Sequence, residues 1–371
     1  MQEAMTIELL AAALRGPHVA QPDARDWSSL LESAEAHGIL PLFTGAGIAA
    51  AWDSTLIAIL RPSLAAHAAT SMAREIELRE VIDALAAHGV RPFVFKGAHL
   101  AFAIYPSPDR RPHVDVDMLV KRDDREALDR CLRHRGYELV PQVTGDVAVG
   151  QQQYWKVDPS GVGHTIDVHW RIANPLAFSD RITYSDLERD AMPVPRLGEH
   201  ARAPSLPLAL VIACLHRTAH HGNSERLIWL YDIHLLASAL DEPGWDSVVE
   251  LSSRRGLSAV VRAGLDRATK YFETAVPAGV SRRLAANRTD DEDLLEFLDG
   301  PRPRLDVARS DWRRISRWRD RSRFLREHLF PPATYIAHRY GTKSPVALPF
   351  LYVRRIVSGA GKWAMESWRS G

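Results

Sequence analysis

The chain has 371 residues, 46% of them hydrophobic and 25% charged, which is the composition of a globular protein long enough to hold two or three cores. Its formal net charge of +1 excludes the strong overall positive field that many nucleic-acid-binding proteins use. The two cysteines, Cys131 and Cys214, lie far apart, which excludes a disulfide framework and favours a reducing, cytoplasmic location.

The N-terminal part, residues 1–70, is predicted to be a helical lead-in that packs on the next unit. It has no basic stretch leading into an apolar core, and the chain has no run of about 18 uncharged apolar residues, so we expect neither a signal peptide nor a transmembrane segment. Apolar residues at helical spacing predict helices over Thr6–Leu14, Trp27–Ala36, Leu40–Ala49, Ser54–Ala66 (interrupted near Pro62) and the amphipathic Ser71–His88.

A strand, a glycine turn and a short helix follow within residues 93–105. Phe93–Phe95 is a β-prone apolar run, and Lys96-Gly97 breaks it. Ala98–Tyr105 is predicted to be a short helix that Pro106 ends. A glycine in such a turn allows backbone N–H groups to approach a phosphate at the helix N-terminus.

The next strand carries two carboxylates. Valine and methionine alternate with Asp115 and Asp117 over Val114–Val120, so both aspartates point to one face, about 6.6 Å apart along the strand. Aspartate is depleted in strands, so two of them flanked by valines need a reason, and shared binding of a divalent cation supplies one. Two exposed aspartates on an edge strand are the alternative.

A later strand brings a third carboxylate. The intervening elements are predicted as a helix over Arg122–Gly136, strands over Tyr137–Val140 and Val147–Val157, and a turn over residues 158–161. His164–Trp170 alternates as a strand with Asp167 and His169 on one face. Pairing of this strand with its neighbours would bring Asp167 beside Asp115 and Asp117.

The rest of the chain reads as helical after a proline-rich stretch, Met192–Pro207, which we interpret as a linker. The predicted helices are Leu206–His220, Ser224–Leu240, Trp245–Arg255, Ser258–Thr274, Glu292–Leu298 and the arginine-rich Trp312–Leu329. We therefore divide the chain into a lead-in (1–70), a core (71–195) and a helical C-terminal domain (196–371).

A glycine turn and three strand carboxylates suit nucleotidyl transfer, because carboxylates, phosphate oxygens and water are the ligands of Mg²⁺. Two Mg²⁺ ions about 3.5–4 Å apart would activate the attacking hydroxyl and neutralise the triphosphate. The accompanying motifs are Lys96-Gly97, Tyr105, Arg111, D-x-D-hydrophobic-hydrophobic-V from Asp115 to Val120, D-hydrophobic-H-W from Asp167 to Trp170, and His216 and His220 with W-hydrophobic-x-D from Trp229 to Asp232.

With these motifs, most of all over residues 90–175, the chain resembles the polymerase-β-type nucleotidyltransferase superfamily and its uncharacterised bacterial branch. The resemblance implies an α+β fold: a minimal nucleotidyltransferase core, a small mixed sheet with packed helices, flanked by mostly helical N- and C-terminal regions. It also implies Asp115, Asp117 and Asp167 as catalytic metal ligands, Gly97 as the phosphate-turn glycine, and an NTP such as ATP as donor.

The turn departs from the wider superfamily, which usually has Gly-Ser where this chain has Lys96-Gly97-Ala98 and no hydroxyl. Lys96 or His99 would then contact phosphate, although Lys96 is as readily an end-of-strand lysine that reaches solvent. Lys156 and Arg111 are further candidates for binding the triphosphate. The alternatives are an exposed strand lysine and an arginine paired with the acidic cluster.

Three histidines are candidate substrate-binding residues. His169 lies on the face of Asp167, where it can hold substrate or orient a carboxylate. His216 and His220 are four residues apart on a predicted helix, a spacing that also suits zinc, but H-R-T-A-H lacks the glutamate of H-E-x-x-H. We expect these two to line the cleft or to pack between helices.

We therefore expect a Mg²⁺-dependent nucleotidyltransferase that moves a nucleoside monophosphate from an NTP to an unidentified acceptor (a small molecule, peptide, protein or RNA) with release of pyrophosphate. One alternative is a non-catalytic module of the same fold that binds a nucleotide or a partner. Another is a nucleic-acid-binding protein that uses residues 312–326, where seven arginines are interleaved with aromatic residues. A solvated helix face is the more ordinary explanation of that segment.

Overall fold

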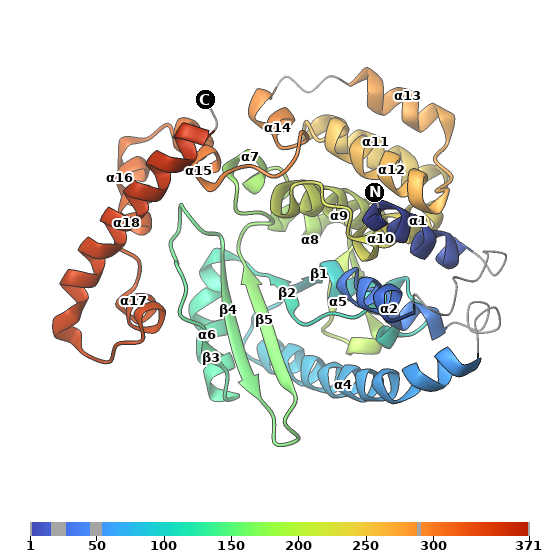
Figure 1. Ribbon diagram of the computed structural model, residues 1–371, viewed down its shortest axis with the longest axis horizontal. Coiled ribbons are helices and arrows are strands. Elements are labelled where there is room, and N and C mark those ends of the chain that lie inside the picture. Colours follow the sequence, from blue (N-terminus) through green and yellow to red (C-terminus); the bar gives the residue numbers. More distant parts are fainter. Residues whose placement is uncertain (1, 16–26, 45–53, 288–290, 370–371) are drawn as a thin grey trace.

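The computed structural model describes residues 2–15, 27–44, 54–287 and 291–369 (Figure 1). Its first elements are α1 (Gln2–Arg15), α2 (Trp27–Ala36) and the 3-10 helix η2 (Leu40–Thr44). The end of the helix predicted over Leu40–Ala49 lies outside the described residues. Leu10 of α1 is fully buried in a core that it shares with the C-terminal helices, so the N-terminal part packs on a distant segment of the chain.

Helix α4 (Ser54–Ala87) is continuous, so the prediction of separate helices over Ser54–Ala66 and Ser71–His88 is wrong. The residues between them, 67–70, include two alanines, the best helix former, and contain no glycine or proline that would stop the helix. Pro62 is accommodated inside α4, where it removes one backbone hydrogen bond. The residues of α4 that are buried against the sheet are Leu78, Val81, Ile82 and Leu85.

In the described residues, the core is a seven-stranded mixed sheet with the strand order β3-β4-β5-β2-β1-β7-β6. The strands are β1 (Phe93–Phe95), β2 (Val116–Leu119), β3 (Glu138–Leu139), β4 (Gln151–Val157), β5 (Gly163–His169), β6 (Ala191–Pro193) and β7 (Arg202–Pro204). Strand β2 pairs antiparallel with β1 and parallel with β5. The predicted α+β fold, a small mixed sheet flanked by helices, is confirmed.

The central strands separate two cores. The residues buried against α4 and α6 (Arg125–His134) include Val94, Met118 and Val168, whereas Phe93, Phe95 and Leu119 belong to the core of the C-terminal helices. Because side chains alternate along a strand, Asp117 and Asp167 share the second face. The candidate site therefore lies between the sheet and the helical part of the chain.

The stretch interpreted as a linker, Met192–Pro207, is instead part of the sheet, and that interpretation is wrong. Strands β6 and β7 pair antiparallel with each other, and Arg202 of β7 pairs parallel with Phe93 of β1. Each of the two strands has only three residues, and prolines end both of them. The sheet thus reaches residue 204, while the three-part division of the chain stays a prediction.

Helices cover the face of the sheet that carries Asp117 and Asp167. They are α9 (Leu206–His221), α10 (Leu227–Ser238), α11 (Glu242–Arg254), α12 (Ser258–Phe272), α13 (Ala278–Ala286) and α14 (Glu292–Glu296), with the short α5 (Lys96–Ala103), α7 (Leu176–Ser179) and α8 (Tyr184–Arg189) nearer the sheet. In Figure 1 they gather above the sheet, and α4 runs below it.

The chain ends in an arm, which lies beyond β3 and β4 on the left of Figure 1. The arm consists of α15 (Arg304–Arg314), α16 (Trp318–Leu329), α17 (Ala333–Tyr340) and α18 (Leu348–Arg369). The prediction of one helix over Trp312–Leu329 is wrong, because Ile315 is extended and buried, and its carbonyl accepts a hydrogen bond from Arg321 Nε at 2.8 Å. Among the described helices, none has the length and apolarity needed to cross a bilayer.

A buried carboxylate fastens the arm to the loop before β4. Glu327 of α16 accepts hydrogen bonds from the backbone N–H groups of Asp146, Val147 and Ala148 at 2.9, 3.1 and 2.8 Å. A Cβ atom on Gly145 would overlap this carboxylate, so the loop needs glycine there. The arm is therefore docked through a specific anion-binding loop.

Several arginines of residues 312–326 are paired within the chain. Arg313 and Arg314 contact Asp293 at 2.9 and 3.1 Å, and Arg323 contacts Glu327 at 3.1 Å. These ion pairs neutralise part of the positive charge that suggested a nucleic-acid-binding surface.

Candidate functional site

The turn after β1 is held in an uncommon backbone conformation. Lys96 has a φ of +55°, in the left-handed region that residues other than glycine seldom adopt. Its Nζ lies 2.6 Å from Asp117 Oδ1, so the lysine folds back over the sheet. A Cβ on Gly97 would lie 3.2 Å from the guanidinium of Arg111, which explains why the next residue is glycine. The backbone of this turn therefore lies close to the charged groups of Lys96 and Arg111.

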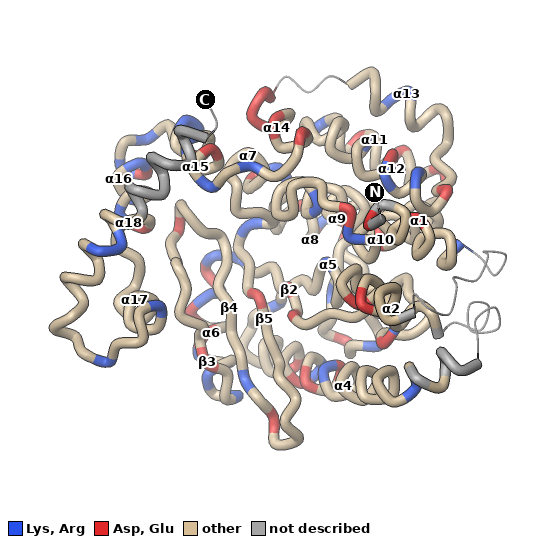
Figure 2. The backbone as a smooth tube through the Cα atoms, in the orientation of Figure 1, with Lys and Arg blue, Asp and Glu red and all other residues tan. Residues whose placement is uncertain are grey.

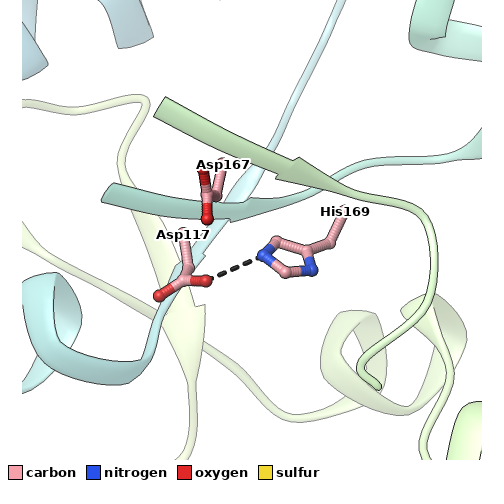
Figure 3. A group of neighbouring side chains, drawn as sticks. All are labelled: Asp117, Asp167 and His169. Atoms are coloured by element: carbon pink, nitrogen blue, oxygen red, sulfur yellow. Dashed lines mark hydrogen bonds and ion pairs between the residues drawn. The ribbon is translucent and has the colours of Figure 1, made fainter. Parts of the chain in front are cut away.

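Two carboxylates stand side by side on neighbouring strands (Figure 3). Asp117 of β2 is directly opposite Asp167 of β5 in the parallel pair. His169 donates from Nε2 to Asp117 Oδ1 at 2.7 Å, and Gln153 of β4 donates to Asp167 Oδ1 at 2.8 Å. One ligand atom from each of Asp117, Asp167 and His169 falls within 4.8 Å of the others. The register of β2 and β5 therefore places Asp167, the predicted third carboxylate, beside Asp117.

Asp115 lies one residue before β2 and outside this tight group, although it lines the same cavity. Burial and the charge of Asp117 raise the pKa of the Asp115 carboxyl, and Lys96 partly opposes that rise. The two residues of the D-x-D motif are thus close enough to interact electrostatically.

The electrostatics of the group show an excess of negative charge. Burial alone would raise the pKa of Asp117, but Lys96 and His169 hold it well below its usual range. Gln153 and Lys96 offset only part of the corresponding effects at Asp167, where burial together with the charge of Asp117 raises the pKa to about 6. A cation at this point would stabilise all the carboxylates, and their oxygen atoms are the donors that Mg²⁺ prefers. The residues present therefore fit a divalent cation.

The acidic group opens into a cavity of about 630 Å³ between the sheet and the helices. Its lining includes His67 of α4, His216 and His220 of α9, and Trp229 of α10. The volume is in the range of small-molecule binding sites, and its lining includes charged as well as apolar groups. The cavity can therefore hold a nucleotide-sized ligand against the carboxylates.

A cluster of histidines forms the helical side of the cavity. His216 lies 5.3 Å from His220 and 4.7 Å from His221 between ring centroids, and His221 stacks on Trp229 at 3.8 Å. Burial, with a further contribution from Lys96, lowers the pKa of His220 to about 3 and that of His216 well below its usual value. These rings are neutral near pH 7 and offer hydrogen bonds, not charge. Within the described residues they join no group of three possible metal ligands.

A family model described as an uncharacterised nucleotidyltransferase matches residues 23–273, about two thirds of the chain and the whole of this site. The chain belongs to the uncharacterised nucleotidyltransferase family. The predicted family membership is thereby confirmed, and it supports nucleotidyl transfer as the general kind of function. No curated protein matches the chain.

Tyr105 and Arg111 meet the distant motif residue Asp232 at one buried point. Arg111 donates to both oxygens of Asp232 at 2.8 and 2.7 Å, and Tyr105 donates to Asp232 Oδ1 at 2.7 Å. Arg111 was predicted to bind the triphosphate, but its guanidinium is committed to Asp232 of α10. It lines the cavity and lies against the Gly97 turn, and its contact with a triphosphate stays a prediction.

Two predicted phosphate-binding residues do not line the cavity. His99 is buried with both ring nitrogens lacking hydrogen-bond partners among the described residues, and burial lowers its pKa to about 4. Lys156 lies on the opposite side of β4 from Gln153 and pairs with Glu77 at 2.7 Å. Alternation and burial turn both side chains away from Asp117, and the idea that either residue contacts phosphate stays a prediction.

Sequence reasoning missed two residues of the candidate site. Gln153 orients Asp167, and only the β4–β5 register reveals it. Arg226, just before α10, lines the cavity and lies 5.1 Å from the ring of Trp229, and it forms no ion pair with any described residue. Its place three residues before the W-hydrophobic-x-D motif was the available signal.

Proposed function

We propose that the chain transfers a nucleoside monophosphate from an NTP to an acceptor hydroxyl in a Mg²⁺-dependent reaction. The acceptor oxygen bonds to the α-phosphorus, the bond from that phosphorus to the bridging oxygen breaks, pyrophosphate leaves, and the acceptor proton passes to solvent. The observation that carries the proposal is the pairing of Asp117 with Asp167 on neighbouring strands, in the lining of a cavity of nucleotide size.

Asp117 and Asp167 would hold the cation, with Asp115 beside them. Bound Mg²⁺ neutralises a triphosphate and lowers the pKa of a nearby hydroxyl. His169 keeps the Asp117 carboxylate in place through its hydrogen bond, and Gln153 does the same for Asp167. Such partners fix the direction of ligand oxygens, which makes the site preorganised.

Lys96 and Gly97 would receive the phosphates. Lys96 already lies beside Asp117 at the cavity, and its ammonium can turn from the carboxylate to a phosphate oxygen. It replaces the serine hydroxyl found in the turn of the wider superfamily by a charged donor, which makes a stronger hydrogen bond to an anion. Arg226 is a second cation at the same cavity.

His216 and His220 would contact the substrate from the helical side. Because their pKa values are lowered, they act as neutral donors or acceptors and add no charge to the metal site. The Nε2 atom of His220 is buried and has no partner among the described residues, so a bound substrate would satisfy it.

The test is release of pyrophosphate and transfer of label from α-labelled NTPs to components of a cell lysate. Asp117→Asn and Asp167→Asn should each lower both signals by at least about a hundredfold, since a metal ligand is lost in each variant. Asp246→Asn is the matched control, because Asp246 is an exposed aspartate on α11 that pairs only with the exposed Arg283 among the described residues.

Equal labelling by Asp117→Asn and the unmodified chain would contradict the assignment. Calorimetry with Mg²⁺ and each NTP separates the main alternative: tight binding without pyrophosphate release would indicate a non-catalytic nucleotide-binding module.

A further inference from the structure

Over its described side chains, the C-terminal helix α18 packs on its own arm through one face. Leu351 is buried, Tyr352 Oη donates to the carbonyl of Pro331 at 2.6 Å, and Arg355 donates to the carbonyl of His328 at 3.3 Å. These contacts fix the helix against the turn between α16 and α17. The direction of its opposite face is therefore determined.

That opposite face is apolar. Phe350, Val353 and Val357 follow one another at helical spacing and are 70%, 59% and 65% exposed, and Val346 in the preceding turn is 85% exposed. A helix that packs through one face normally carries polar residues on the other. A contiguous apolar stripe on the outside marks a surface that binds something.

The same segment is strongly basic. Between Glu327 and Glu366 the sequence contains no acidic residue and five basic residues: Arg339, Lys343, Arg354, Arg355 and Lys362. The other 42 basic residues and all 46 acidic residues lie in the rest of the chain, which therefore has a small net negative charge. The near-neutral total is the sum of this remainder and a positive C-terminal segment. Figure 2 shows Lys and Arg but no Asp or Glu along α17 and the described part of α18.

We propose that the outward face of α18, with Val346, docks on the surface of an anionic lipid bilayer. An apolar stripe beside basic side chains is the combination that holds a helix in the plane of a membrane interface, where apolar side chains enter the acyl boundary and cations meet anionic headgroups. A nucleic-acid backbone would match the charge but would leave Phe350, Val353 and Val357 in water. This surface lies outside residues 23–273, so the inference is independent of the catalytic assignment.

The experiment is co-sedimentation of the full chain with vesicles of phosphatidylcholine, with or without about 30% phosphatidylglycerol, at about 0.1 M and 0.5 M salt. We expect binding to the anionic vesicles at least about tenfold stronger than to the neutral ones, and weaker binding at high salt. The double variant Phe350→Asp/Val353→Asp should lose at least about tenfold in partition to the anionic vesicles. Met72→Asp is the control, because Met72 of α4 is 66% exposed and should bind like the unmodified chain.

Several results would overturn the inference. One is equal binding of the double variant and the unmodified chain; another is equal binding to neutral and anionic vesicles. Sedimentation velocity without lipid tests for self-association. If the unmodified chain is a dimer and Phe350→Asp/Val353→Asp is a monomer, the stripe is a self-association surface. Salt-dependent binding to RNA that survives the double variant, with no vesicle binding, would assign the charge to nucleic acid. Circular dichroism should show unchanged melting of the variants, since every substituted residue is exposed.

Discussion

Replacing Lys96 by methionine should have opposite effects on the binding of Mg²⁺ alone and of nucleotide. In the unliganded site the Lys96 ammonium lies 2.6 Å from Asp117 Oδ1, with both side chains about nine-tenths buried. A divalent cation entering the site meets that charge. At a separation of about 5 Å and an effective dielectric constant of about 20, the repulsion is roughly 6 kcal/mol.

Lys96 can turn away, so only part of this repulsion acts on the cation. We expect Lys96→Met to bind Mg²⁺ about 10- to 100-fold more tightly in the absence of nucleotide, which corresponds to about 1.4–2.8 kcal/mol. Nucleotide binding should weaken by a similar factor, because the variant loses a charge-assisted hydrogen bond worth about 1.5–3 kcal/mol. Methionine retains the length of the side chain and the same left-handed backbone.

Titration calorimetry with Mg²⁺ alone, and then with a non-hydrolysable NTP at saturating Mg²⁺, measures both effects. Lys156→Met is the matched control, because Lys156 pairs with Glu77 and is absent from the cavity lining, so neither affinity should change. Weaker binding of Mg²⁺ by Lys96→Met, or an unchanged affinity for nucleotide, would refute the reasoning.

Three further predictions concern stability and packing. Asp232→Asn should lower the free energy of unfolding in urea by about 3–5 kcal/mol, because Arg111 keeps a buried charge without its partner. The double variant Arg111→Met/Asp232→Leu should lose less stability than Asp232→Asn, and a larger loss of stability would contradict this account. Gly145→Ala should displace the Glu327 carboxylate from three backbone N–H groups and weaken docking of the arm by about 1–3 kcal/mol. Proteolysis of the arm should then be faster, whereas an unchanged rate of cleavage would show that other contacts hold the arm. Burial raises the pKa of Asp311 to about 6, above its ordinary value of 3.8, so its contribution to stability is complete below about pH 3.8 and is lost as the pH rises through 6. Asp311→Asn should therefore be more stable than the unmodified chain at pH 7.5, by up to about 3 kcal/mol, and equal to it near pH 4 in thermal melts.

The sequence predicted the residues that meet at the site better than it predicted their partners. Alternation along two strands was sufficient to place Asp117 and Asp167 on matching faces, because the period of a strand is two residues whatever the rest of the fold does. The sequence did not show on which side of β4 Lys156 lies. Lys156 is three residues from Gln153, and only the register of β4 against β5 shows that it points away from Asp167.

The partner of Arg111 could not be predicted, because Asp232 is 121 residues away and the chain offers 46 acidic residues. The hairpin of β6 and β7 was missed since strands of three residues that end in proline carry no periodic signal. The interruption of the helix at Ile315 depends on a tertiary contact from Arg321, which local propensity does not encode.

The position of β7 has a practical consequence for anyone who divides this chain. Strand β1 lies between β2 and β7, and a fragment that stops at residue 195 removes β7. Such a fragment would expose the backbone of β1 as a free edge and leave Phe93 and Phe95 without the helices that bury them. We expect it to aggregate on expression, whereas residues 1–195 and the C-terminal helices should stay in solution only when they are made as one chain.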